Sequence, residues 1–94
     1  MNNKLIMFLK KCGVAADAID EIYAANPQMF MGNNEEIVKN ISLVIEHGFP
    51  DYEIGELLLL NSSFVFSPSS DLECRLSLLG ENVYEMLISN PNLI

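Results

Sequence analysis

A chain of 94 residues, half of them hydrophobic, is sized for one domain with an apolar core. Its formal net charge of −8, with 13 acidic residues against five Lys and Arg, disfavours nucleic-acid binding, because that binding draws most of its strength from neutralised phosphates. An acidic surface favours basic partners instead. The apolar runs at residues 5–9 and 57–60 are too short for a signal peptide or a membrane span, so we expect a soluble, cytoplasmic protein without a membrane segment.

The first thirty residues predict two helices and a short turn. Residues 4–12 predict a helix that ends at Gly13, because their apolar side chains recur at i, i+3, i+4 and i+7. Residues 15–25 predict a second helix, which Pro27 ends. Residues 28–30 predict a short turn that places Phe30 inside. The expected apolar positions are Leu5, Phe8, Leu9 and Cys12 in the first helix and Ala18, Ile19, Ile22 and Tyr23 in the second.

The next segment predicts a second helix pair. Asn33 and Glu36 have the spacing of a capping box, and the helix they open is predicted to end at Gly48. The apolar stripe of this helix is Ile37, Ile41, Val44 and Ile45. His47 in the last turn is read as a donor near the helix C-terminus rather than as a catalytic group. Residues 50–60 predict a helix with proline at its first position, and Leu57 to Leu60 surround it on nearly all sides. This helix is therefore expected to be the buried, central one.

A third pair follows Pro68. Ser70 and Glu73 predict another capping box, Leu72, Leu76 and Leu79 give the apolar stripe, and Gly80 ends the helix. The last helix carries Val83, Met86, Leu87 and Ile88 and ends at Asn90–Pro91. Leu93 and Ile94 then form an apolar tail. Two interpretations of the tail stay open: an uncovered end that docks a partner, or a tail folded back onto the last helix.

These elements repeat at a regular interval. Gly13, Gly48 and Gly80 are 35 and 32 residues apart, and Asn26, Asn61 and Asn90 are 35 and 29 residues apart. Periods between about 20 and 50 residues are typical of repeat architectures. The sequence therefore predicts an all-α fold, a short α-solenoid of about six helices in one domain spanning 1–94, with units at about 1–33, 34–66 and 67–94.

The repeated pattern resembles a known family. A leucine-rich helix ending in Gly, then a helix ending in Asn-Pro, then an apolar pair, is similar to the mitochondrial transcription termination factor (mTERF) family. The likeness is carried by FLKKCGVAADAIDEIYAANPQMF, LVIEHGFPDYEIGELLLLNSSFVF and RLSLLGENVYEMLISNPNLI. It implies a superhelical stack of three repeats, each with two helices and a short 3₁₀ turn. It also implies nucleic-acid binding along a basic groove in transcription regulation, for which the candidate contacts here are Lys4, Lys10, Lys11, Lys39 and Arg75.

The sequence shows no constellation of catalytic or metal-binding residues. One histidine and no Cys-x-x-Cys pair leave no zinc site and no nucleophile–base pair, so we expect no enzyme activity, no metal and no cofactor. Cys12 and Cys74 are read as buried reduced thiols rather than a disulfide. We therefore expect a binding module that contacts a protein partner, or itself, through its acidic surface or through Leu93 and Ile94. The alternative is the nucleic-acid binding that the resemblance implies.

Overall fold

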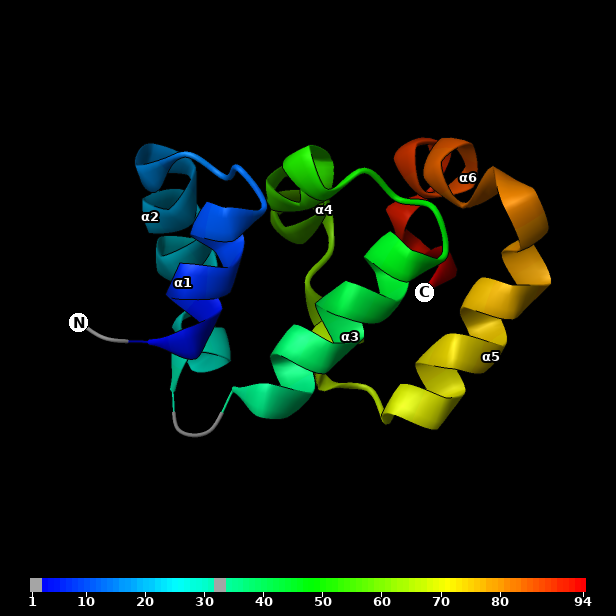
Figure 1. The fold of residues 1–94 in the computed structure, drawn as a ribbon, viewed down its shortest axis with the longest axis horizontal. Helices are drawn as coiled ribbons and strands as arrows, with labels where there is room; N and C mark the ends of the chain where they lie inside the picture. The colour runs from blue at the N-terminus through cyan, green and yellow to red at the C-terminus, as the bar shows by residue number, and fades with distance from the viewer. Residues whose placement is uncertain (1–2, 32–33) are drawn as a thin grey trace.

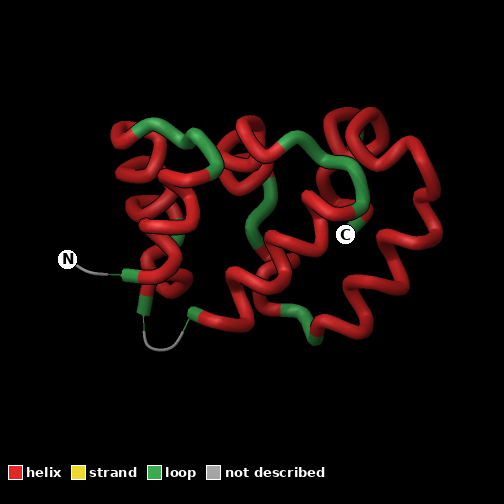
Figure 2. The backbone as a smooth tube through the Cα atoms, viewed as in Figure 1, coloured by secondary structure: helices red, strands yellow, loops and turns green. Residues whose placement is uncertain are grey.

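The structure, a computed structural model, describes residues 3–31 and 34–94. The helices are α1 (Lys4–Lys11), α2 (Ala16–Ala25), α3 (Glu35–Glu46), α4 (Ile54–Leu60), α5 (Ser69–Leu79) and α6 (Val83–Ser89). Short 3₁₀ turns stand between and after them: η1 (Pro27–Phe30), η2 (Asp51–Glu53), η3 (Ser63–Phe66), η4 (Gly80–Asn82) and η5 (Pro91–Leu93). No strand forms in the described residues, so the predicted all-α class is confirmed (Figure 2). No helix among them has the length and apolar content needed to cross a membrane.

The order of two helices followed by a 3₁₀ turn occurs three times. We call these unit one (α1, α2, η1), unit two (α3, α4, η3) and unit three (α5, α6, η5). The first helices lie side by side, α1 against α3 and α3 against α5, while α2 packs on α4. The units follow one another along the longest axis of a molecule that measures 37 × 23 × 20 Å (Figure 1).

Glycine ends the first helix of each unit, as predicted. Gly13 and Gly48 have φ values of 94° and 117°, a region that favours a residue without a side chain. After Gly48, the Phe49 N–H donates to the carbonyl of Val44 at 3.2 Å, and the Gly48 N–H donates to Ile45 at 3.0 Å. Unit one has the same pair of bonds, which together form a Schellman motif. Gly80 also has a positive φ, 65°, but it begins η4.

The core lies between the first helices of the units (α1, α3 and α5) and the second helices (α2, α4 and α6). Leucines at the predicted stripe positions of α1 and α5 are fully buried, as are Ile41 and Val44 in α3. The prediction that all four leucines of α4 are buried is wrong. Leu57 and Leu58 are buried, whereas Leu59 and Leu60 are 41% and 57% exposed. The reason is that α4 packs on its neighbours along one side only and its other side meets solvent.

Two helix starts differ from the prediction. The chain after Pro50 first makes the 3₁₀ turn η2, so α4 begins only at Ile54. α5 begins at Ser69 with Pro68 at its N-cap, which places Ser70 inside the helix, and the predicted capping box is absent. The Asn33 box falls outside the described residues. At the start of α3 the buried Asn34 side chain donates to the carbonyl of Met29 at 3.3 Å instead of capping the helix.

A buried asparagine joins units two and three. Asn40 has no exposed surface, and its amide nitrogen donates to the carbonyl oxygens of Val65 at 3.0 Å and Ser67 at 2.8 Å. Its side-chain oxygen accepts from the Ser69 hydroxyl at 2.9 Å. One side chain thus links α3 to the segment after η3 and to the first residue of α5.

Candidate functional site

The three asparagines at the ends of the second helices occupy equivalent places in the structure. Asn26, Asn61 and Asn90 have φ values of −150°, −158° and −148°. The backbone N–H of each closes the preceding helix by donating to the residue four positions earlier, at 2.8–2.9 Å. They therefore provide a register in which the units can be compared residue by residue.

In this register, each asparagine amide reaches the next unit. The amide nitrogen of Asn26 donates to the Ser62 hydroxyl at 2.9 Å, and that of Asn61 donates to the Pro91 carbonyl at 2.7 Å. Both acceptors belong to the residue that follows the next unit's asparagine. The side-chain oxygen of Asn90 accepts from the Asn92 N–H at 3.3 Å, as that of Asn61 accepts from the Ser63 N–H at 3.1 Å. Within the described chain the amide nitrogen of Asn90 has no acceptor, and the residue is exposed.

A second contact between units also recurs in register. The residue that follows the glycine at the end of a unit's first helix contacts the residue six positions before the asparagine of the next unit. Between units one and two, a Cβ built on Gly55 would lie 3.0 Å from Cγ1 of Val14. Between units two and three, the rings of Phe49 and Tyr84 are 5.4 Å apart at 61°. This pair of positions therefore recurs at both junctions, although α4 and α6 do not pack on each other as α2 and α4 do.

Burial in this register separates the two sides of a unit. The fourth residue before the asparagine and the third residue after it are buried in units one and two but exposed in unit three. The pairs are Ile22 (1%) and Met29 (0%), Leu57 (0%) and Phe64 (0%), and Met86 (37%) and Leu93 (37%). The third residue before the asparagine shows the opposite order: Tyr23 is 43% exposed, Leu58 3% and Leu87 0%. We expect this order if the first two positions lie towards the following unit and the third towards the preceding one.

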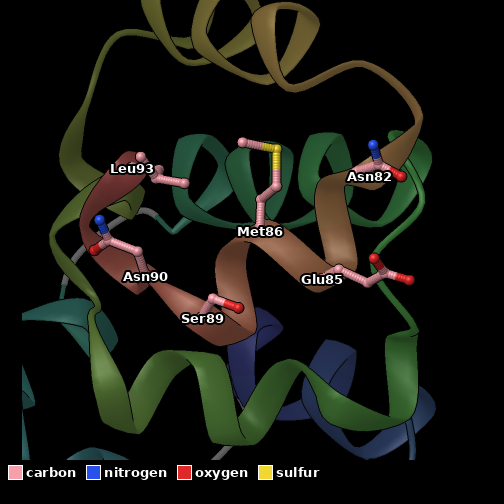
Figure 3. Close-up of a pocket in the computed structure, with 6 residues that line it drawn as sticks. All are labelled: Asn82, Glu85, Met86, Ser89, Asn90 and Leu93. Carbon is pink, nitrogen blue, oxygen red and sulfur yellow. The ribbon is translucent and has the colours of Figure 1, made fainter.

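The exposed side of unit three is hollowed. The hollow has a volume of about 330 Å³. Figure 3 shows its lining side chains on α6, on the turns η4 and η5 that flank it, and at Asn90 between α6 and η5, with Met86 between Leu93 and Asn82. We call the six lining residues the C-terminal face: Asn82, Glu85, Met86, Ser89, Asn90 and Leu93. Its chemistry is two apolar side chains, polar groups around them and one carboxylate.

The structure separates the two residues of the predicted tail site. Leu93 belongs to the C-terminal face, but Ile94 is only 6% exposed. The reason is that η5 turns the chain back onto α6, where Ile94 takes the place that Phe30 and Val65 take in the earlier units. Sequence reasoning missed Met86 and Asn90, although the spacing of the three asparagines was a usable signal for both.

The basic residues proposed as nucleic-acid contacts are spread over three helices. Lys4 and Lys11 line one shallow hollow on α1, together with Met7 and Phe8. Lys4 also pairs with Glu35 at 2.9 Å, and this bond lowers the pKa of the Glu35 carboxyl from its ordinary value. The others are Lys10 in the last turn of α1, Lys39 in α3 and Arg75 in α5.

The remaining reactive groups form no site. Cys12 is buried, as predicted, but Cys74 is exposed, and both are free thiols. Burial, together with the nearby charge of Asp51, raises the pKa of Cys12. His47 is the C-cap of α3, and no three His, Cys, Asp or Glu side chains in the described residues cluster as metal ligands do. Comparisons with protein-family models, curated proteins and solved structures find no significant match to this chain.

Proposed function

We propose that this chain is a non-enzymatic binding module, a short α-solenoid of three mTERF-like repeats that binds a protein through its C-terminal face. One observation carries the proposal. The equivalents of Met86 and Leu93 are buried in units one and two, and the equivalents of the Asn90 amide bond the following unit, whereas in unit three all three groups are exposed. Exposed apolar side chains around a hollow have the chemistry of a surface that is buried in a contact.

The chemistry of the face favours a protein over other ligands. Its two apolar side chains suit an apolar side chain of a helix, and the Asn90 amide suits a backbone carbonyl at the end of such a helix. Unit three carries four acidic residues and one basic residue, which repel phosphate groups. Glu85 at the edge of the hollow adds to that repulsion.

Substitution of Met86 tests the proposal. Proteins retained by the immobilised chain are identified from an extract of the cells that make it, purified, and titrated calorimetrically against the chain and its variants. We expect Met86→Glu to weaken binding at least about tenfold, because it places a charge where an apolar side chain is to be buried. Truncation after Asn92 is a poorer test, since it removes the buried Ile94 and so disturbs the core.

Leu60→Glu is the matched control. Leu60 is 57% exposed on α4 of unit two and lies outside the C-terminal face, so this variant adds the same charge elsewhere. It should bind as the unchanged chain does. Equal affinities for the Met86 and Leu60 variants would contradict the proposed binding face.

Nucleic-acid binding is the second candidate. It is favoured by the hollow on α1, where Lys4 and Lys11 flank Phe8, and by Lys39, which lies nine residues before its glycine just as Lys4 does. Fluorescence anisotropy with single- and double-stranded oligonucleotides tests it. Phosphate-driven binding would be present at about 20 mM salt, would weaken steeply as salt is added, and would be reduced by Lys11→Gln with Lys39→Gln. No binding at low salt removes this candidate.

A further inference from the structure

Two sides of the molecule expose positions whose equivalents are buried elsewhere in the chain. Met86 and Leu93 of unit three are each 37% exposed, whereas their equivalents in units one and two are buried. Tyr23 of unit one is 43% exposed, whereas its equivalents in units two and three, Leu58 and Leu87, are buried.

We infer that the protein bound by the C-terminal face is unit one of a second copy of this chain, so that copies associate head to tail. This inference rests on the proposed function and names its partner. The internal junctions supply the arrangement: α6 of one copy would lie beside α2 of the next, and α5 beside α1, continuing the contacts of α2 with α4 and of α3 with α5.

The hydrogen bond between units has its acceptor ready in a second copy. Asn61 donates to the carbonyl of the proline that follows Asn90. The residue that follows Asn26 is also a proline, Pro27, and it is exposed. In the head-to-tail contact the Asn90 amide would therefore donate to the Pro27 carbonyl of the second copy, in the same geometry as the bond between units two and three.

Lys10 is the basic residue of α1 that is left for this contact. Lys4 pairs with Glu35 of α3, and Lys11 lines a hollow with Ser42 and Glu46 of α3, so both lie towards unit two of their own chain. α5 carries Asp71 and Glu73 against Arg75. Lys10 of one copy beside these carboxylates of another favours the encounter.

One pair of positions opposes the contact and supplies its sharpest test. Val14 contacts Gly55 at one internal junction, and Phe49 contacts Tyr84 at the other. At the head-to-tail junction the equivalent residues are Glu81 of one copy and Asp20 of the next. Two carboxylates there repel each other, so the unchanged chain associates weakly and reversibly. A lysine at either position would convert the repulsion into an ion pair.

Charge reversal at these two positions tests the inference. Sedimentation velocity is measured from about 10 to 500 µM for the unchanged chain, Asp20→Lys, Glu81→Lys and the double variant. We expect each single variant to associate about tenfold or more tightly, with a mass that keeps growing with concentration, because a head-to-tail contact does not close on itself. The double variant restores a like-charged pair and should return to weak association.

Blocked chains define which faces meet. In the Asp20→Lys background, Met86→Glu blocks the C-terminal face and Tyr23→Glu blocks unit one. Each blocked chain should be a monomer, and a mixture of the two should give a 1:1 dimer, since each retains the face that the other lacks. Circular dichroism confirms that each variant is folded.

The outcomes separate this inference from the proposed function. If Asp20→Lys stays monomeric, or if its association persists with Met86→Glu, head-to-tail pairing is overturned. If pairing is overturned but a purified partner still loses affinity with Met86→Glu, the C-terminal face binds a different protein and the proposed function stands. If Met86→Glu changes neither measurement, both are wrong.

Discussion

Asn40 shows how a single polar residue holds two units together. It is completely buried, and it satisfies backbone carbonyls around η3 as well as the Ser69 hydroxyl. Asn40→Leu fills a similar volume but leaves these groups without partners in the core. We expect it to lower the free energy of unfolding by about 2–4 kcal/mol, measured by chemical denaturation.

A neighbouring substitution controls for the helix itself. Lys39→Leu changes the adjacent, exposed position of α3 and should alter the free energy of unfolding by less than about 0.5 kcal/mol. If both variants lose the same stability, the effect comes from α3 in general. The hydrogen bonds of Asn40 would then not be what joins units two and three.

At the scale of an element, Gly48 sets the direction in which the chain leaves α3. Its φ of 117° is one that side chains rarely adopt, and no atom lies within 4 Å of an added Cβ. The cost of Gly48→Ala is therefore backbone strain alone, which we expect to lower the free energy of unfolding by about 1–2 kcal/mol. Ser77→Ala, at an exposed position of α5, is the control and should be nearly neutral. Equal stability of the Gly48 variant and the unchanged chain would show that this turn relaxes into another conformation.

The sequence predicted the elements whose formation depends on residues close together in the chain. Apolar periodicity, together with glycine and proline at helix ends, located all six helices to within a few residues. It failed where tertiary contacts decide: Pro50 was placed at a helix start, but the chain makes η2 first. The exposure of Leu59 and Leu60 was missed for the same reason, since a run of leucines does not say which side of α4 has a neighbour.

At the scale of the whole molecule, the candidate face was only half visible in the sequence. Leu93 and Ile94 are alike as apolar residues, and only the path of η5 buries one and exposes the other. Met86 is no more apolar than its buried equivalents Ile22 and Leu57, so composition does not distinguish it. What distinguishes it is the order of the units in space, which depends on contacts between residues about thirty positions apart.

The net charge of −8 also acts on the whole molecule. Like charges on a small surface repel one another and destabilise the folded state, and added salt screens this repulsion. The Lys4–Glu35 pair weakens with salt, but it is a single ion pair between exposed side chains. We therefore expect the melting temperature to rise by about 2–5 °C between 10 and 150 mM NaCl, measured by calorimetry.

Charge neutralisation checks the origin of that rise. Glu21 and Glu73 are both exposed, one on α2 and one on α5. The variant Glu21→Gln with Glu73→Gln reduces the net charge to −6 and should show a smaller rise, because less repulsion remains for salt to screen. A melting temperature that falls with salt in the unchanged chain would mean that attraction between opposite charges outweighs the excess of acid. The repulsion expected between Glu81 and Asp20 of two copies would then be local to that junction and not part of a general repulsion between the acidic residues of the surface.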